Sequence, residues 1–156
     1  MSLSFRNVDA SPGDPVGSWP YEAMVIALER GLVQDWKPIF AEIRLRPWGL
    51  VARRVEEIAL DVDSTGVAAL FRRATKAARE ESDRRDREEV ARRVRLSIRR
   101  SGLTAGQFAE LIGTSASRLS TYTRGKVMPS AALLVRMERT ALSQRPVAAG
   151  TPRSRS

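Results

Sequence analysis

Residues 103–129, LTAGQFAELIGTSASRLSTYTRGKVMP, decide the fold of the C-terminal half of this chain. Thr104 can cap the N-terminus of a first helix and Ser115 that of a second, because both side chains can accept hydrogen bonds from first-turn amides. Gly113 stands between them, where a tight turn requires a residue that tolerates a positive φ. Gly125 can end the second helix. The stretch therefore predicts two short helices joined by a tight turn.

The apolar residues of this stretch recur at helical spacing, which gives each helix one face that can be buried. These positions are Phe108, Leu111, Ile112, Leu119 and Tyr122. On the same register Arg118 points outward from the second helix. A short helix, a tight turn and a second helix with an outward cation are the layout of a helix-turn-helix.

Charge is divided unevenly along the 156 residues, whose net charge is +9. Residues 90–156 contain 13 Lys/Arg and 2 Asp/Glu, a net charge of +11. Residues 1–89 contain 14 Lys/Arg and 16 Asp/Glu, a net charge of −2. A polyanionic partner explains this asymmetry, because each phosphate that is neutralised releases counterions. The alternative is a basic tail that aids solubility or reflects genome composition.

Composition excludes several classes of protein. The chain has no cysteine and no histidine, so it lacks thiolate metal ligands, disulfides and the commonest acid-base catalyst. No apolar run approaches the length of a membrane span, and the N-terminus lacks the order of a signal peptide. We therefore expect a cytoplasmic, nucleoid-associated protein without a cofactor, a metal, a catalytic residue or a membrane partner.

One acidic cluster keeps an enzymatic alternative open. Glu56, Glu57, Asp61 and Asp63 could form an acidic active site or metal site. Arg53 and Arg54 lie close by in the sequence, which favours neutral pairing on the surface. We expect the pairing and not the active site.

The pattern along the chain predicts an all-α protein with a small N-terminal helical domain, a charged helical connector and a C-terminal helix-turn-helix domain. The expected parts are an irregular leader (1–18), the N-terminal domain (19–78), the connector (79–89), the DNA-binding domain (90–142) and a disordered basic tail (143–156). The connector contains no apolar residue and can place acids four residues before bases, which favours an exposed helix. A polar stretch of a coiled coil is the alternative.

Four helices are expected before the connector. The first follows Pro20 and stops at Gly31, and the second contains Pro38, which fits only in a first turn. The third begins at Pro47. Asp63 or Ser64 caps the fourth.

Within residues 90–142 the chain resembles the Cro and phage-repressor-like helix-turn-helix family, also called the XRE family. The resemblance is carried by Leu103–Thr104, Phe108–Ala109, Leu111–Ile112–Gly113, Ser115, Leu119–Ser120, Tyr122, Arg124–Gly125–Lys126 and Pro129–Ser130. It implies a lambda-repressor-like domain whose second helix lies in the major groove of DNA. Residues 19–75 are similar to the N-terminal half of uncharacterised actinobacterial regulators, a resemblance that implies no chemistry.

The resemblance also implies which residues contact DNA. Base edges would be read by Ala116, Ser117, Arg118 and Thr121, and phosphates would be bound by Thr104, Arg124, Lys126 and Ser130. Arg118 can make two hydrogen bonds to a guanine edge. The chain departs from the family at Ala105, where Gln is common, and at Thr123, where Glu is common.

The N-terminal half contains Trp19, Trp36 and Trp48. These side chains can build a small helical core, or Trp36 and Trp48 can belong to a dimer or partner interface. We expect a dimeric, sequence-specific transcriptional regulator, in the first place an autorepressor, that binds double-stranded DNA. The alternative is an antitoxin whose N-terminal domain binds a toxin while the helix-turn-helix represses the shared operon.

Overall fold

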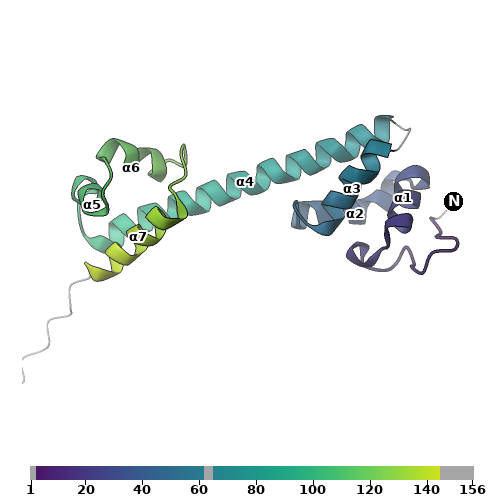
Figure 1. Ribbon diagram of the computed structural model, residues 1–156, viewed down its shortest axis with the longest axis horizontal. Helices are drawn as coiled ribbons and strands as arrows, with labels where there is room; N and C mark the ends of the chain where they lie inside the picture. The colour runs from purple at the N-terminus through teal and green to yellow at the C-terminus, as the bar shows by residue number, and fades with distance from the viewer. Residues whose placement is uncertain (1–2, 62–64, 145–156) are drawn as a thin grey trace, which may run out of the picture. The chain divides into compact units, whose positions relative to one another are not determined.

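The computed structural model describes residues 3–61 and 65–144, and within these ranges it contains helices and no strand, so the all-α prediction is confirmed (Figure 1). The elements are the 3-10 helix η1 (Val16–Ser18) and the α-helices α1 (Tyr21–Arg30), α2 (Val33–Leu45), α3 (Leu50–Asp61), α4 (Thr65–Ser101), α5 (Ala105–Ile112), α6 (Ala116–Thr123) and α7 (Ala131–Ser143). The chain forms two compact units, residues 1–83 and residues 84–156. None of the helices in the described ranges is long and apolar enough to span a membrane.

Helix α4 runs without a break for 37 residues, so the expected fourth helix, the connector and the first helix of the DNA-binding domain are one element. Residues 67–101 contain neither Gly nor Pro, and nothing in this stretch interrupts the helical hydrogen bonds. The exposed pair Lys76–Glu80 lies one helical turn apart and adds a small stabilisation. The expected caps Asp63 and Ser64 lie outside the described residues. Of the expected tail 143–156, Ser143 is the last residue of α7 and Gln144 its C-cap, and the rest lies outside the described residues.

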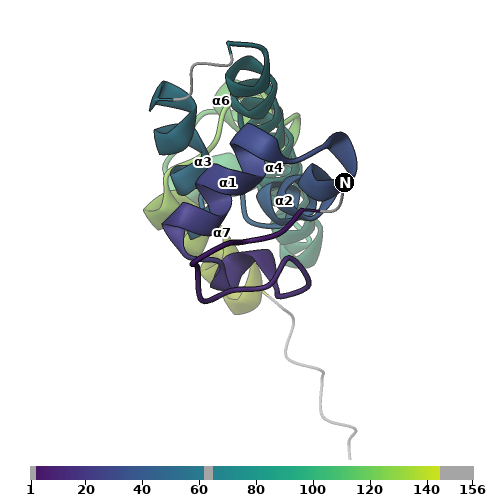
Figure 2. The same ribbon diagram turned by 90° about the vertical axis from the view of Figure 1, so that its right-hand side faces the viewer.

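The N-terminal unit is built on an apolar core contributed by η1 and the first four α-helices. Its largest fully buried side chains are Trp19, Met24, Leu28, Ile39, Ile43, Val55, Ile58 and Phe71. The leader is irregular apart from η1, yet it is part of this unit: Leu3, Phe5, Val8 and Ala10 pack against the core. The ring of Phe5 meets that of Trp19 edge-on, with centroids 5.0 Å apart. Figure 2 shows this segment lying alongside α1 and α2.

Gly31 ends α1 as expected, but the reason is close approach and not a positive φ. Its φ is −71°, and a Cβ at this position would overlap the carbonyl oxygen of Ala27. The same oxygen accepts a hydrogen bond from Nε1 of Trp36 at 2.8 Å. Trp36 is buried in the apolar core, so its expected place in a partner interface is not supported, whereas Trp48 is 50% exposed.

Two helix boundaries differ from the expectation. Helix α2 begins at Val33, because the carboxylate of Asp35 accepts a hydrogen bond from the amide of Leu32 at 2.7 Å. Pro38 therefore lies in the second turn and not in the first. Helix α3 begins at Leu50 and not at Pro47, whose carbonyl oxygen accepts a hydrogen bond from Nε of Arg79 at 3.0 Å.

One member of the acidic cluster, Glu56, is used in packing. Arg79 of α4 binds both carboxylate oxygens of Glu56, at 2.7 and 2.9 Å. Arg54, expected to neutralise this cluster, donates instead to the carbonyl oxygen of Trp19 at 2.7 Å. The described residues contain no group of three or more acidic side chains placed to hold a metal ion.

Thr75 of α4 provides a test of this packing. Its side chain is fully buried, and Oγ1 has no hydrogen-bond partner among the described residues. Thr75→Val should raise the free energy of unfolding by about 1 kcal/mol, because an unsatisfied hydroxyl leaves the core. Thr75→Ser keeps the hydroxyl and removes a methyl group, so it should lower that free energy by about 1 kcal/mol. Urea unfolding followed by circular dichroism measures both; a destabilised Thr75→Val protein would contradict this account.

Candidate nucleic-acid interface

Helix α5 is closed at both ends by local hydrogen bonds. At its start, Oγ1 of Thr104 accepts from the amide of Gln107 at 3.3 Å, and Oε1 of Gln107 accepts from the amide of Thr104 at 3.0 Å. At its end, Gly113 has a φ of 78° and donates its amide to Glu110, while the amide of Thr114 donates to Ala109. This is a Schellman turn, which satisfies the last carbonyls and requires a left-handed residue. The expected cap at Thr104 and turn at Gly113 are both present.

Helix α6 has the same arrangement. Oγ of Ser115 accepts from the amide of Arg118 at 3.1 Å, as expected for an N-cap. At the other end Gly125 has a φ of 68°; its amide donates to Tyr122, and the amide of Lys126 donates to Thr121. Capping at both ends keeps an eight-residue helix ordered that would be marginal in isolation.

A small apolar core holds α5 and α6 against α7 and the last turns of α4. Its buried members are Val94, Phe108, Ala109, Ile112, Leu119, Tyr122 and Met137. Leu111, expected to face inward, is 52% exposed. Because Leu119 and Tyr122 face this core, the opposite face of α6 is left on the surface.

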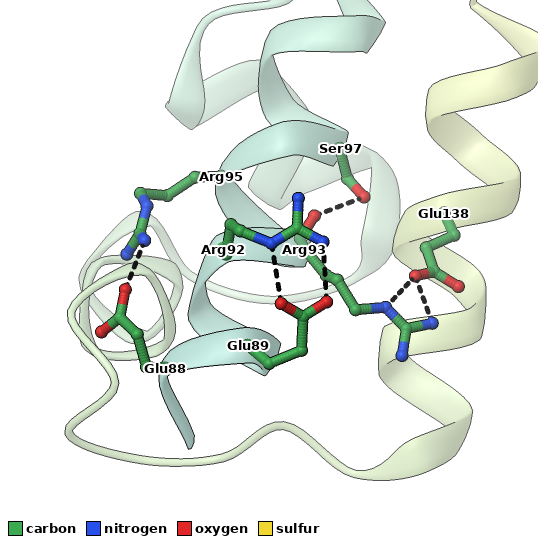
Figure 3. A network of polar contacts seen from close by, with 7 residues as sticks. All are labelled: Glu88, Glu89, Arg92, Arg93, Arg95, Ser97 and Glu138. Carbon is green, nitrogen blue, oxygen red and sulfur yellow. Dashed lines mark hydrogen bonds and ion pairs between the residues drawn. The ribbon is translucent and has the colours of Figure 1, made fainter. Parts of the chain in front are cut away.

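Two arginines attach the C-terminal ends of α5 and α6 to the rest of the unit. Arg95 of α4 donates from Nη1 to the carbonyl oxygen of Thr123 at 2.6 Å and from Nη2 to Glu88 at 2.8 Å. Arg136 of α7 donates from Nη1 to the carbonyl oxygen of Ile112 at 3.1 Å. Each cation lies at the negative end of a helix, where it is favourable. Figure 3 shows Arg95 in its pairing with Glu88.

Most arginines of the basic run at the end of α4 make contacts within this unit; the run consists of Arg92, Arg93, Arg95, Arg99 and Arg100. Arg93 pairs with Glu138 of α7 at 2.6 Å, and Arg92 makes two hydrogen bonds of 2.7 Å to Glu89 (Figure 3). These hydrogen bonds lower the pKa of Glu89 and raise the pKa of Arg92. With Arg95 also engaged, three of the five arginines in this run already have acidic partners.

The residues expected to read bases lie on the surface of α6. Ala116, Ser117 and Arg118 are exposed, and the guanidinium of Arg118 has no hydrogen bond or ion pair with any residue that the structure describes. Thr121 is half-buried, and its hydroxyl donates to the carbonyl oxygen of Arg118 at 2.7 Å. Its oxygen can still accept a hydrogen bond from a ligand.

The residues expected to bind phosphate divide into two kinds. Arg124 and Lys126 are exposed and, within the described ranges, have no side-chain partner. Thr104 and Ser130 are exposed, but their hydroxyls act as caps; Oγ of Ser130 accepts from the amide of Leu133 at 3.2 Å. A phosphate at the start of α5 would therefore meet first-turn amides, which have no partner within the helix.

Three residues that shape this surface were missed by sequence reasoning. Gln107 forms a capping box with Thr104, and the sequence TAGQ carries that signal. Arg95 and Arg136 act on carbonyl groups 28 and 24 residues away, and no local pattern indicates such contacts.

Comparison with known proteins finds a helix-turn-helix domain in the same segment. Residues 89–140, about a third of the chain, match the family model described as a helix-turn-helix domain. No curated protein and no solved structure matches the chain. The all-α fold thus includes a C-terminal helix-turn-helix domain, which supports a DNA-binding regulator.

Substituting Gly113 in the turn and Gly106 within α5 by alanine tests the role of the turn, because the same change is made at a positive φ and inside a helix. Gly113→Ala should lower the free energy of unfolding by about 1–2 kcal/mol, because a Cβ is strained at positive φ. Gly106→Ala should raise it by about 0.5–1 kcal/mol, since Gly106 lies within α5 and a Cβ there meets open space. Urea unfolding of both variants measures the difference; equal effects would contradict the role assigned to the turn.

Proposed function

We propose that this chain is a sequence-specific transcriptional regulator of the Cro and phage-repressor type, which binds DNA as a dimer and represses its own gene. The observation that supports it most is the outer face of α6, a helix capped at both ends, where the guanidinium of Arg118 is exposed and has no partner among the described residues. The family match at residues 89–140 supports a DNA-binding role for this helix.

Base reading is assigned to the exposed side chains of α6. Arg118 can donate two hydrogen bonds to the O6 and N7 atoms of a guanine. Since Thr121 already donates its proton within the helix, it can accept from the amino group of adenine or cytosine, or contact a thymine methyl group. Ser117 donates or accepts with little selectivity, and Ala116 can contact a thymine methyl group.

Phosphate binding is assigned to groups that surround α6. Arg124 and Lys126 follow the helix directly, and the first-turn amides of α5 lie near Thr104. Ser130 can donate its hydroxyl proton while it caps α7. The net charge of residues 84–156, with 16 Lys/Arg against 5 Asp/Glu, is +11 and would attract DNA over a longer range.

Dimerisation is assigned to the N-terminal unit. Leu45 ends α2, Trp48 lies in the loop that follows, and Leu50 begins α3; their side chains are 68%, 50% and 46% exposed. Exposed aromatic and aliphatic side chains that are close in the chain are typical of a contact with another protein. The same surface keeps the antitoxin alternative, in which the partner is a toxin and not a second copy.

A fluorescence anisotropy titration tests the proposed function. The full chain is titrated against its own upstream region, with random DNA as competitor, at two salt concentrations. Binding that survives the competitor supports an autoregulator. Binding that is equal on both DNAs and lost at the higher salt would contradict sequence-specific reading and leave only electrostatic coating of DNA.

Two substitutions separate base reading from phosphate binding. Arg118→Ala should cost about 1–3 kcal/mol on the specific site and relax discrimination at one base pair. Lys126→Ala should weaken binding on all sequences and reduce the slope of affinity against salt by about one unit. Arg30→Ala, an exposed arginine at the end of α1, is the control for the loss of one charge. Wild-type affinity in both test variants would refute the proposed contacts.

The proposed dimer surface has its own test. Trp48→Glu should weaken self-association at least about ten-fold, because a charge replaces an apolar contact. Leu60→Glu changes an exposed leucine at the end of α3 and should have no such effect. Sedimentation equilibrium measures both; an unchanged dimer in Trp48→Glu would move the interface elsewhere.

A further inference from the structure

The C-terminal unit has an open groove of about 230 Å³ between α4 and α7. Its lining is Arg93, Leu96, Ser97 and Arg100 from α4 and Glu138, Ala141 and Leu142 from α7. Leu96, Ala141 and Leu142 form its apolar part, and Leu142 is 58% exposed. This volume is below the usual range for a drug-sized ligand but can take one or two side chains of a partner.

The groove lies on the side of α4 that faces away from α6. Arg93, Ser97 and Arg100 are spaced three and four residues apart, so they share one face of α4. Arg95 lies on another face, from which it reaches the end of α6. Figure 3 shows Arg93 and Arg95 leaving α4 in opposite directions, with Arg93 directed toward α7. The groove is therefore separate from the surface assigned to DNA.

The charge of the groove selects its partner. Arg100 is exposed and has no hydrogen bond or ion pair to a described residue, while Arg93 is matched by Glu138 alone. The groove thus carries one cation in excess, within a unit of net charge +11. A second strongly basic surface would be repelled here, whereas a carboxylate beside an apolar side chain would be complementary.

We propose that this groove is a docking site for an acidic amphipathic helix of a partner protein. A leucine-like side chain would enter between Leu96 and Leu142, and a carboxylate would pair with Arg100. A third helix can pack in the groove between two packed helices, as amphipathic helices do in other helix-in-groove complexes. Since the site faces away from α6, it stays open when α6 is occupied, and docking does not depend on DNA binding.

The test uses a synthetic helical peptide of about 18 residues, long enough to hold some helix alone, with leucines on one face and glutamates beside them. Its binding to the full-length protein is followed by fluorescence anisotropy without DNA. Two control peptides replace all leucines by alanine or all glutamates by lysine. Saturable binding of the first peptide alone is the expected result; equal binding of the alanine peptide would overturn the proposal.

Protein variants locate the site. Arg100→Glu and Leu142→Ala should each lower the affinity for the leucine–glutamate peptide at least about ten-fold. Arg100→Glu should also raise the affinity for the lysine peptide. Arg99→Glu makes the same charge change on the neighbouring residue and should have little effect. Loss of binding in Arg118→Ala or Lys126→Ala would overturn the proposal, because the acidic peptide would then be imitating DNA.

A second copy of the chain is the competing occupant. If Leu142→Ala lowers the mass of the free protein in sedimentation equilibrium, the groove is a contact between copies and the proposal fails. The expected result is an unchanged mass. Because neither measurement contains DNA, a failure here is distinguishable from a failure of the proposed regulator function.

Discussion

The left-handed turn at Gly113 is the constraint on which the C-terminal unit depends. It joins two helices of eight residues, and its two amide hydrogen bonds satisfy carbonyl groups at the end of α5 that would otherwise have no partner within the helix. The direction of α6 relative to α5 follows from this turn. That direction lets Leu119 and Tyr122 reach the core formed by Phe108 and Met137. The outer face of α6, with Arg118, is what the turn leaves on the surface.

The basic residues of this unit fall into two groups: those that make contacts within the unit and those that are free to bind a ligand. Arg95 and Arg136 bind the last carbonyls of α6 and α5, and Arg93 joins α4 to α7. Through these contacts the arginines fix the positions of α5 and α6 relative to α4 and α7. Arg118, Arg124 and Lys126 have no partner within the described residues. A basic composition alone does not separate these groups, because both contribute equally to the net charge.

In the N-terminal unit the helices are joined by side-chain contacts between residues that are distant in the sequence. Gly31 allows the indole of Trp36 to reach the carbonyl of Ala27, so one side chain ties α2 to the end of α1. Arg79 ties α4 to both Glu56 and Pro47. Glu56, one of the four acids that allowed an enzymatic interpretation of the sequence, is in this way used for packing. Leu45, Trp48 and Leu50 are among the apolar side chains of this unit that stay on the surface.

The sequence by itself determined the all-α class, the caps at Thr104 and Ser115, and the turn at Gly113, because each depends on residues within a few positions of one another. The continuity of α4 and the start of α2 before Pro38 also have local causes, namely the lack of Gly and Pro in residues 67–101 and the hydrogen bond between Asp35 and Leu32. Only the tertiary structure decided that Trp36 is buried while Trp48 is exposed. It also decided which arginines are engaged, since their partners lie 28 and 45 residues away in the chain. Local patterns record hydrogen bonding along the chain, whereas burial and ion pairing depend on residues brought together by packing.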